Sequence, residues 1–419
     1  MPGRLAEHSR NEQQNSWDST CLPTVGPNIE PHIVFVCSRW HPNVAGPAAY
    51  VRRTLQPLLS AFRDEVSVVT EVRPHHIPPI PPTLPKGFFA AVQPPSWLPA
   101  GLGSEACGAW LAIKACVFSA RRSRRPVLYF TGGHVSAGWR TAAILGTWLR
   151  VRVIVESVLV GADDAASLLR ARWPLLTQRA AKCVACFSTI SSALHSSFAS
   201  DLPDARVVYN PYGVDTELFQ PATAAQRRCQ REALSLAEAD FVGLFVGNVS
   251  PRKDVLSLVE AWIKTASLRP DMNWVLLIVG QYEPSSEYGQ SIQQRLAEVP
   301  VNAQVRLLGA REDIPAIMNA CDAYVSASTA EGLGIANVEA LAAGLPVVCR
   351  HLPGITDDMT HGDAVTGIHD WSPTAFAQAM HHVADPRHWA QFSADARMIA
   401  EERFGLGGRI ERLRALTQE

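Results

Sequence analysis

Two glutamates eight positions apart stand in the segment of the sequence best suited to chemistry, residues 326–339. Glu331 lies in a Gly-rich loop that should follow a strand, and Glu339 lies in the helix that should begin after it. Backbone N–H groups of Gly332, Leu333 and Gly334, with the positive end of the helix dipole, can bind a diphosphate. Glu331 could then accept hydrogen bonds from sugar hydroxyls, and Glu339 from a ribose diol. Alternatively, the glycines form a plain turn and Glu339 is an exposed helix carboxylate.

A second loop of the same kind covers residues 247–253, with sequence GNVSPRK. It follows an apolar run typical of a buried strand and carries Asn248, Arg252 and Lys253. Cations at such a loop suit a phosphate ligand, because charge-assisted hydrogen bonds to phosphate are strong. The alternative is that Arg252 and Lys253 are ordinary surface charges.

The elements that must position these loops form two series of alternating strands and helices. Such alternation predicts an α/β fold of two Rossmann-like, doubly wound domains that face an inter-domain cleft, where ligands bind at the carboxyl ends of the strands. Apolar runs and helical periodicity predict strands at 32–37, 66–69, 127–130, 151–155, 183–190, 241–246, 274–279, 305–308, 323–328 and 346–349, and helices near 48–62, 105–121, 136–149, 164–182, 255–267, 287–297, 313–319, 335–343, 373–383, 387–402 and 406–417. Dense prolines predict an excursion loop at 74–99.

The expected domains follow from this series. They are a disordered tail at 1–30, an acceptor-side domain at 31–210, a linker at 211–239, a donor-binding domain at 240–400, and a C-terminal helix at 401–419 that packs back on the first domain.

Three motifs in order resemble glycosyltransferase family 4, a group of retaining, nucleotide-sugar-dependent transferases with the GT-B fold. They are the Glu331/Glu339 pair followed by EALAAGLPVV, the segment NPYGVDTELF at 210–219, and the loop at 247–253. The likeness is strong over 205–370 and mostly topological over 31–205. It implies a metal-independent transfer from a UDP- or GDP-type sugar to a carbohydrate, lipid-linked or small-molecule hydroxyl. No bound cofactor is implied, since the nucleotide sugar is a co-substrate.

The resemblance also assigns roles to single residues. Lys253 would contact the diphosphate, Glu331 would act at the sugar, and Gly46 would let the backbone approach the donor phosphates or acceptor. His134 resembles a family histidine, although a lone histidine is more often structural. Two positions depart from the family pattern, because Asn248 replaces an arginine and Glu156 replaces a histidine. Glu156 could bind the acceptor or act as a base, or it could merely cap the following loop.

Composition and charge restrict the remaining classes. The chain has 419 residues, 47% of them hydrophobic, so disorder throughout is excluded. The sequence contains no Asp-x-Asp, HExxH or Walker motif, and therefore no metal site is expected. Nine scattered cysteines and the lack of a visible signal peptide favour a reduced, cytoplasmic protein. Nucleic acid is not an expected partner.

Charge is unevenly distributed along the chain. Residues 31–210 contain 19 Lys/Arg and 9 Asp/Glu, whereas residues 211–419 contain 17 and 26. The basic half includes an arginine cluster at 121–125, with Phe88, Phe89 and Trp97 nearby in the sequence. We therefore expect peripheral contact with the inner face of a membrane. The alternative is that the arginines are solvated and the acceptor is soluble.

Two other functions are compatible with these motifs. An epimerase of the same fold would bind the same donor without an acceptor. A non-catalytic partner subunit of another glycosyltransferase would keep the fold without activity, which Asn248 and Glu156 favour and the intact Glu331/Glu339 pair opposes.

Overall fold

Two parallel β-sheets organise the residues that the computed structural model describes, which are 32–37, 62, 66–71, 89–92, 103–121, 126–131, 137–170 and 173–418. The sequence-based expectation of an α/β fold with two Rossmann-like sheets is confirmed. The tail at 1–30 and most of the helix expected at 48–62 lie outside the described residues.

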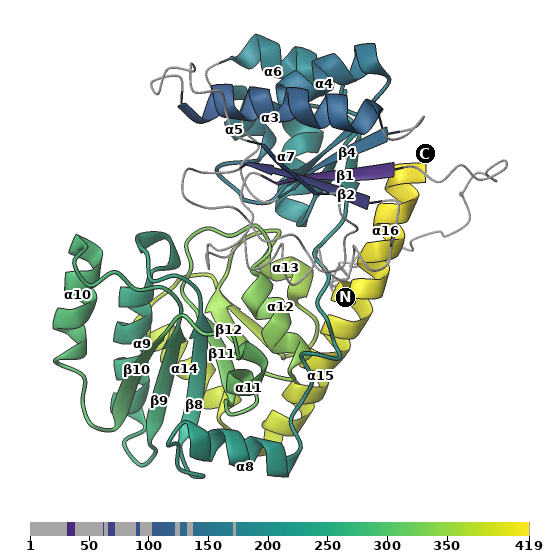
Figure 1. Cartoon of the computed structure of the whole chain (residues 1–419). Coiled ribbons are helices and arrows are strands. Elements are labelled where there is room, and N and C mark those ends of the chain that lie inside the picture. Colours follow the sequence, from purple (N-terminus) through teal and green to yellow (C-terminus); the bar gives the residue numbers. More distant parts are fainter. Residues whose placement is uncertain are drawn as a thin grey trace, which may run out of the picture. The chain divides into compact units, whose positions relative to one another are not determined.

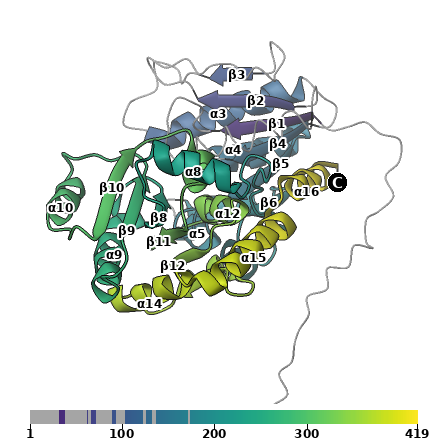
Figure 2. The ribbon, with the colours of Figure 1, turned by 90° about the horizontal axis from the view of Figure 1, so that it is seen from below.

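The first sheet has seven parallel strands in the order β3-β2-β1-β4-β5-β6-β7 (Figure 2). Continuous apolar runs such as HIVFVC and RVIVES form its centre, because these strands are covered on both faces. The strands are β1 (His32–Cys37), β2 (Val66–Glu71), β3 (Phe89–Val92), β4 (Pro126–Thr131), β5 (Arg152–Ser157), β6 (Cys186–Thr189) and β7 (Val207–Tyr209).

Helices α3, α4 and α6 form a layer over this sheet (Figure 1). Small residues and Trp139 face the strands and make one apolar core with Val34, Leu128 and Phe187. The helices of this part are α3 (Gly103–Ala120), α4 (Ala137–Leu149), α5 (Ala165–Arg170), α6 (Pro174–Ala181) and α7 (Ser192–Asp201).

The second sheet has six parallel strands in the order β10-β9-β8-β11-β12-β13. They are β8 (Phe241–Val246), β9 (Trp274–Val279), β10 (Ala303–Gly309), β11 (Ala323–Ser326), β12 (Val347–Arg350) and β13 (Val365–Ile368). The accompanying helices are α8 (Ala224–Ala233), the short 3₁₀ helix η4 (Pro251–Lys253), α9 (Val255–Leu268), α10 (Glu287–Leu296), α11 (Ile314–Met318), α12 (Ile335–Ala342), α13 (Thr356–Met359), α14 (Pro373–Val383), α15 (Pro386–Phe404) and α16 (Leu406–Gln418).

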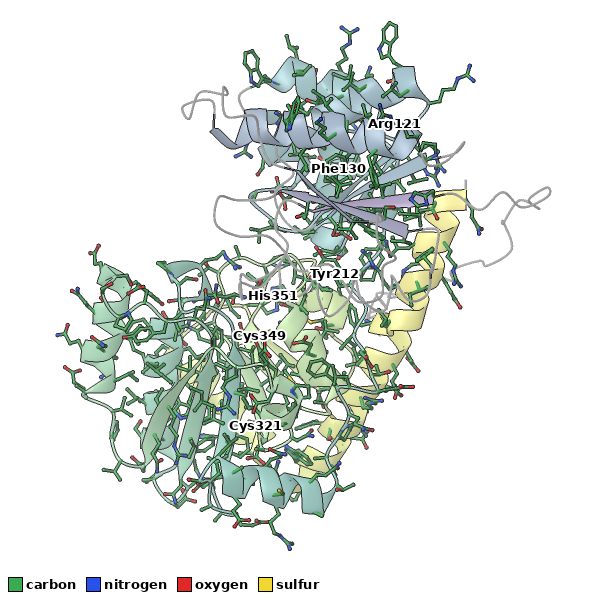
Figure 3. All side chains as sticks on the ribbon, in the orientation of Figure 1. Arg121, Phe130, Tyr212, Cys321, Cys349 and His351 are labelled. Atoms are coloured by element: carbon green, nitrogen blue, oxygen red, sulfur yellow. The ribbon has the colours of Figure 1, made fainter. Side chains whose placement is uncertain are left out.

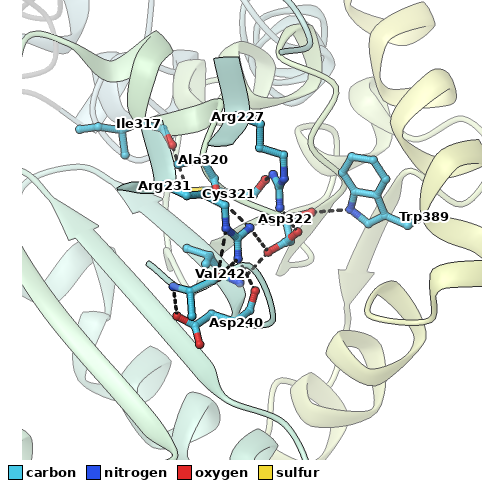
Figure 4. A network of polar contacts seen from close by, with 10 residues as sticks. Arg227, Arg231, Asp240, Val242, Ile317, Ala320, Cys321, Asp322 and Trp389 are labelled. Carbon is cyan, nitrogen blue, oxygen red and sulfur yellow. Dashed lines mark hydrogen bonds and ion pairs between the residues drawn. The ribbon is translucent and has the colours of Figure 1, made fainter. Parts of the chain in front are cut away.

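A polar network fastens α8 and α15 to the amino ends of β8 and β11 (Figure 4). The Asp322 carboxylate accepts from Arg227 Nη2 at 2.5 Å, from Arg231 Nη1 at 3.4 Å and from the backbone N–H of Val242 at 2.8 Å. The indole of Trp389 donates to the Asp322 carbonyl at 2.8 Å. Since ligands of such sheets bind at the opposite, carboxyl edge, this network serves the fold.

The C-terminal helix α16 contacts the first sheet. Val214 of the inter-sheet segment forms a parallel bridge with Gly405, between α15 and α16. A Cβ at Gly213 would lie 2.7 Å from the Cα of Leu406, so glycine allows the two segments to approach closely. At the far end of α16, Arg152 of β5 donates to the Thr417 carbonyl at 3.1 Å.

Some sequence-based elements were wrong in detail. Residues 164–182 form two helices, because Pro174 begins α6 and lacks the N–H that a continuous helix needs. The stretch at 74–99 contains the edge strand β3, whose residues FAAV are free of proline. The sequence reasoning missed the strands β7 and β13 and the helices α7, α8 and α13.

Candidate functional site

The two loops singled out in the sequence meet at the carboxyl edge of the second sheet. Lys253 Nζ forms an ion pair with Glu331 Oε1, and Arg252 Nη1 lies 3.3 Å from Glu331 Oε2. Arg252 Nη1 also donates to the Ala330 carbonyl at 2.6 Å, while the N–H of Thr329 donates to the Arg252 carbonyl at 2.9 Å. The loop after β8 and the loop after β11 thus form one polar cluster, which we call the Lys253–Glu331 cluster.

The first of these loops owes its shape to a tight turn. Pro251 begins η4, and Asp254 then adopts a left-handed conformation with φ of 48° before α9 starts. Asp254 is held by Arg350 Nη2 at 2.6 Å, and Arg350 Nε donates to the Ala327 carbonyl at 3.0 Å. Arg350, at the end of β12, therefore fixes both loops and adds a third cation. The sequence reasoning missed it, although its position directly after the run VVC was a signal.

The Glu331 carboxyl is held in its charged form. Burial raises the pKa of Glu331, but the charges of Lys253 and Arg252 oppose this effect and leave the pKa below its ordinary value. At neutral pH the cluster therefore carries a carboxylate between two cations.

We expect the ion pairs of Glu331 to stabilise the fold at neutral pH and to lose that effect in acid. A carboxyl whose pKa is lowered on folding contributes stability above its unfolded pKa, near 4.5, and loses it as pH falls through the folded value. Urea unfolding of the wild type and of Glu331→Gln should thus differ at pH 7 and converge at low pH. A difference that grows as pH falls would contradict this assignment.

The Gly-rich loop is covered by the first domain. A Cβ at Gly332 would lie 1.8 Å from the Val158 carbonyl oxygen, just beyond β5. The N–H of Val160 donates to the Glu331 carbonyl at 3.3 Å. Gly334 caps α12 with φ of 78°, a conformation that favours glycine. The carboxyl edges of the two sheets therefore meet at this loop.

Glu339 lies in α12 behind the loop, with 5% of its surface exposed. Leu333, in the loop that precedes α12, is also buried, with 1% of its surface exposed. The pKa of Tyr324 in β11 is raised, mainly by burial of its side chain. The negative charges of Glu331 and Glu339 raise it further. Both glutamates thus act on one phenol, whose hydroxyl donates to the Val246 carbonyl at the end of β8 at 3.3 Å. Glu339 is buried, unlike the exposed helix carboxylate of the alternative interpretation.

Asn248 is half-buried between β8 and η4. A Cβ at Gly280 would lie 1.9 Å from the Gly247 carbonyl oxygen, so the end of β9 packs directly on this loop. The N–H of Val249 donates to the Gln281 carbonyl at 2.9 Å, which fixes the backbone on both sides of Asn248.

Glu156, at the end of β5, is not part of the Lys253–Glu331 cluster. Its carboxylate is fully buried and pairs with the guanidinium of Arg409 in α16. Tyr129 donates to Glu156 Oε1 at 2.8 Å and Tyr212 to Oε2 at 3.3 Å, and Thr131 bonds to the same carboxylate. These contacts favour a structural role for Glu156, which connects β5 to α16 through Arg409. The partners of the carboxylate are side chains of other elements, whereas a loop cap would bond to the loop that follows β5. His134 and Gly46 lie outside the described residues.

Neither a membrane span nor a metal cluster is found in the described part of the chain. There, no helix is long and apolar enough to cross a bilayer. Over the same residues, no group of three or more His, Cys, Asp and Glu side chains is placed to hold a metal ion.

The part of the chain that carries the site is similar to known glycosyltransferases. Residues 240–385 match the model described as Glycosyl transferases group 1. The chain is 29% identical over 170 residues to the lipopolysaccharide core biosynthesis mannosyltransferase LpsB of Rhizobium meliloti (strain 1021), a match that covers 40% of this chain and 46% of that protein. It is 34% identical over 146 residues to the UDP-Gal:alpha-D-GlcNAc-diphosphoundecaprenol alpha-1,3-galactosyltransferase of Escherichia coli, covering 34% and 36% of the two chains. The match thus spans less than half the length of these relatives.

A solved structure confirms the fold over nearly the whole chain. Anabaena Alr3699/HepE, crystallised in complex with UDP, superposes with a TM-score of 0.70 at 20% identity, covering 91% of this chain and 98% of that one. The GT-B architecture expected from the sequence is confirmed.

Proposed function

We propose, supported by the match of residues 240–385 to the model described as Glycosyl transferases group 1, that the protein is a retaining glycosyltransferase that uses a UDP- or GDP-type sugar. It would transfer the sugar to a hydroxyl of a carbohydrate, lipid-linked or small-molecule acceptor, without a bound metal. The observation that carries the proposal is the Lys253–Glu331 cluster, where two cations, a carboxylate and a Gly-rich helix start share one strand edge.

The proposed chemistry follows from the charges at this edge. The bond between the anomeric carbon and the diphosphate breaks while the acceptor oxygen bonds to the same carbon, and the acceptor proton passes to a departing phosphate oxygen. Negative charge grows on the diphosphate, where Lys253 and Arg252 would stabilise it most strongly in the transition state. Glu331 holds both cations in place and could accept hydrogen bonds from the sugar hydroxyls.

Replacement of Glu339 by alanine is expected to weaken donor binding by about 2 kcal/mol, since a charged hydrogen-bond acceptor for the ribose would be lost. Titration calorimetry with the active nucleotide sugar measures the effect. The matched control is Glu401→Ala, which removes an exposed carboxylate from α15. Equal affinities for Glu339→Ala and wild type would show that Glu339 does not bind the donor.

Activity is expected to survive a chelator. Arg252 and Lys253 can neutralise part of the diphosphate charge, so the account requires no divalent cation. Initial rates with and without excess EDTA test this directly. Complete loss of turnover in EDTA, with recovery on addition of Mg²⁺ or Mn²⁺, would contradict the proposal.

Product analysis tests the function as a whole. The protein would be incubated with a panel of UDP- and GDP-sugars and candidate acceptors, and the products resolved by mass spectrometry and NMR. A glycoside with the anomeric configuration of the donor is expected. An epimerised nucleotide sugar with no acceptor product would point to the epimerase alternative, and donor binding without any turnover would favour a non-catalytic subunit.

A further inference from the structure

The helical layer of the first domain carries most of the exposed large apolar side chains. Ten such side chains stand out among the described residues, and seven belong to α3, α4, α6 or the residue that precedes α6. Trp148 is 85% exposed and Leu175 79% exposed. We call this set the apolar face: Ile113, Val117, Trp148, Leu149, Trp173, Leu175 and Leu176.

These side chains share one layer of the fold. Their helices pack inward through a single core, which includes Leu111 of α3, Trp139 of α4 and Ala180 of α6. The opposite sides of the same helices therefore point outward, and Figure 3 shows side chains projecting from the layer that bears Arg121. Isolated apolar side chains are normal on a surface, but a group on neighbouring helices marks an interaction site.

The exposed charged side chains described on this layer are cations. Exposed cations lie on the helices or directly after them: Lys114, Arg121, Arg150, Arg170, Arg179 and Lys182. The sequence of the four helices α3–α6 holds a single carboxylic residue, Glu105. Asp204, beyond α7, lies 3.7 Å from Lys182, in a pair whose side chains are both at least 70% exposed.

We infer that the apolar face, with its surrounding cations, docks on the surface of an anionic lipid bilayer. Tryptophan and leucine side chains insert at the boundary of headgroups and acyl chains, while arginine and lysine attract the anionic headgroups. A surface that bound a neutral apolar partner would not need cations around it. The inference concerns binding alone and does not rest on the proposed reaction.

The experiment is co-sedimentation of the full chain with vesicles of phosphatidylcholine alone or of phosphatidylcholine with phosphatidylglycerol. We expect binding to the anionic vesicles at low salt, weaker binding at high salt, and little binding to the neutral ones. Equal binding to both vesicle types, or none to either, would overturn the inference.

Two variants localise the surface. Arg121→Gln/Arg150→Asn/Arg179→Gln should weaken binding on the order of 10²-fold, from about fivefold for each cation. Trp148→Ser/Trp173→Ser/Leu175→Ser should weaken it by on the order of tenfold or more. The control Leu268→Ser/Val301→Ser changes exposed apolar residues of the other sheet's domain and should bind like wild type. A melting temperature for each variant shows that it is folded.

Two further results would overturn the inference. If the apolar variant bound vesicles as wild type does, the face would not be the docking surface. If sedimentation velocity instead showed a dimer that the apolar variant abolishes, with no vesicle binding, the face would be an interface between copies of this chain.

Discussion

Replacing Lys253 by alanine is expected to lower kcat/KM for glycosyl transfer by about 10²- to 10³-fold. This is the range found when one preorganised group that stabilises developing charge is removed, equal to about 2.7–4 kcal/mol of transition-state stabilisation. Lys253 ends η4 at the carboxyl edge of the second sheet and pairs with Glu331. Among the described residues, its loss leaves Arg252 as the cation that pairs with Glu331. Steady-state kinetics with the donor and acceptor found by product analysis provides the measurement.

Two controls separate chemistry from folding in this test. Lys264→Ala removes a lysine from the other end of α9 and should leave kcat/KM unchanged. Lys253→Arg keeps the charge and should retain more activity than Lys253→Ala. If Lys253→Ala had the kinetics of the wild type, Lys253 would have no role in the reaction.

Loss of Arg409 is expected to destabilise the fold by about 3–5 kcal/mol, because Arg409→Ala leaves the buried Glu156 carboxylate without its ion-pair partner. The two side chains are 1% and 0% exposed. Arg409 also donates to the Asn210 carbonyl and, at 3.2 Å, to the Tyr129 hydroxyl. Urea unfolding at pH 7, monitored by tryptophan fluorescence, measures the change.

A surface ion pair supplies the comparison for this second prediction. Glu401→Ala breaks the half-exposed pair with Arg397 in α15, which should cost at most about 1 kcal/mol. The double variant Glu156→Gln/Arg409→Met should cost less than the sum of its single changes, since neither partner is left charged and buried. Similar costs for Arg409→Ala and Glu401→Ala would show that the buried pair contributes little.

Local sequence signals predicted some elements to the residue. The continuous apolar runs of β8 and β9 and the helix α14 have the bounds expected from the sequence. In α14, Ser372 caps the first turn and Pro373 stands at the first helical position, a combination that marks a helix start. By contrast, β7 and β13 have three and four residues, and they become strands only by pairing with β6 and β12.

The same distinction holds for the candidate site, where local sequence signals predicted the loops but not the side-chain pairs between distant elements. The loops of Lys253 and Glu331 could be identified because each follows an apolar strand and precedes a helix, which places both at one sheet edge. The partner of Glu156 could not be found, because Arg409 is 253 positions away and nothing in α16 distinguishes it from the other arginines of that helix. The sequence therefore predicts which segments meet at a sheet edge, whereas side-chain pairs between distant elements require the structure.

The most direct test of the account is whether a nucleotide-diphosphate sugar binds at the Lys253–Glu331 cluster. Thermal unfolding would be followed for wild type and Lys253→Ala with UDP- and GDP-sugars in turn. At a concentration 100 times Kd, a ligand that binds only the folded state stabilises it by about 2.7 kcal/mol. We predict that at least one nucleotide sugar raises the Tm of the wild type, and that Lys253→Ala abolishes most of the shift. No shift with any donor, or equal shifts in both proteins, would contradict the account.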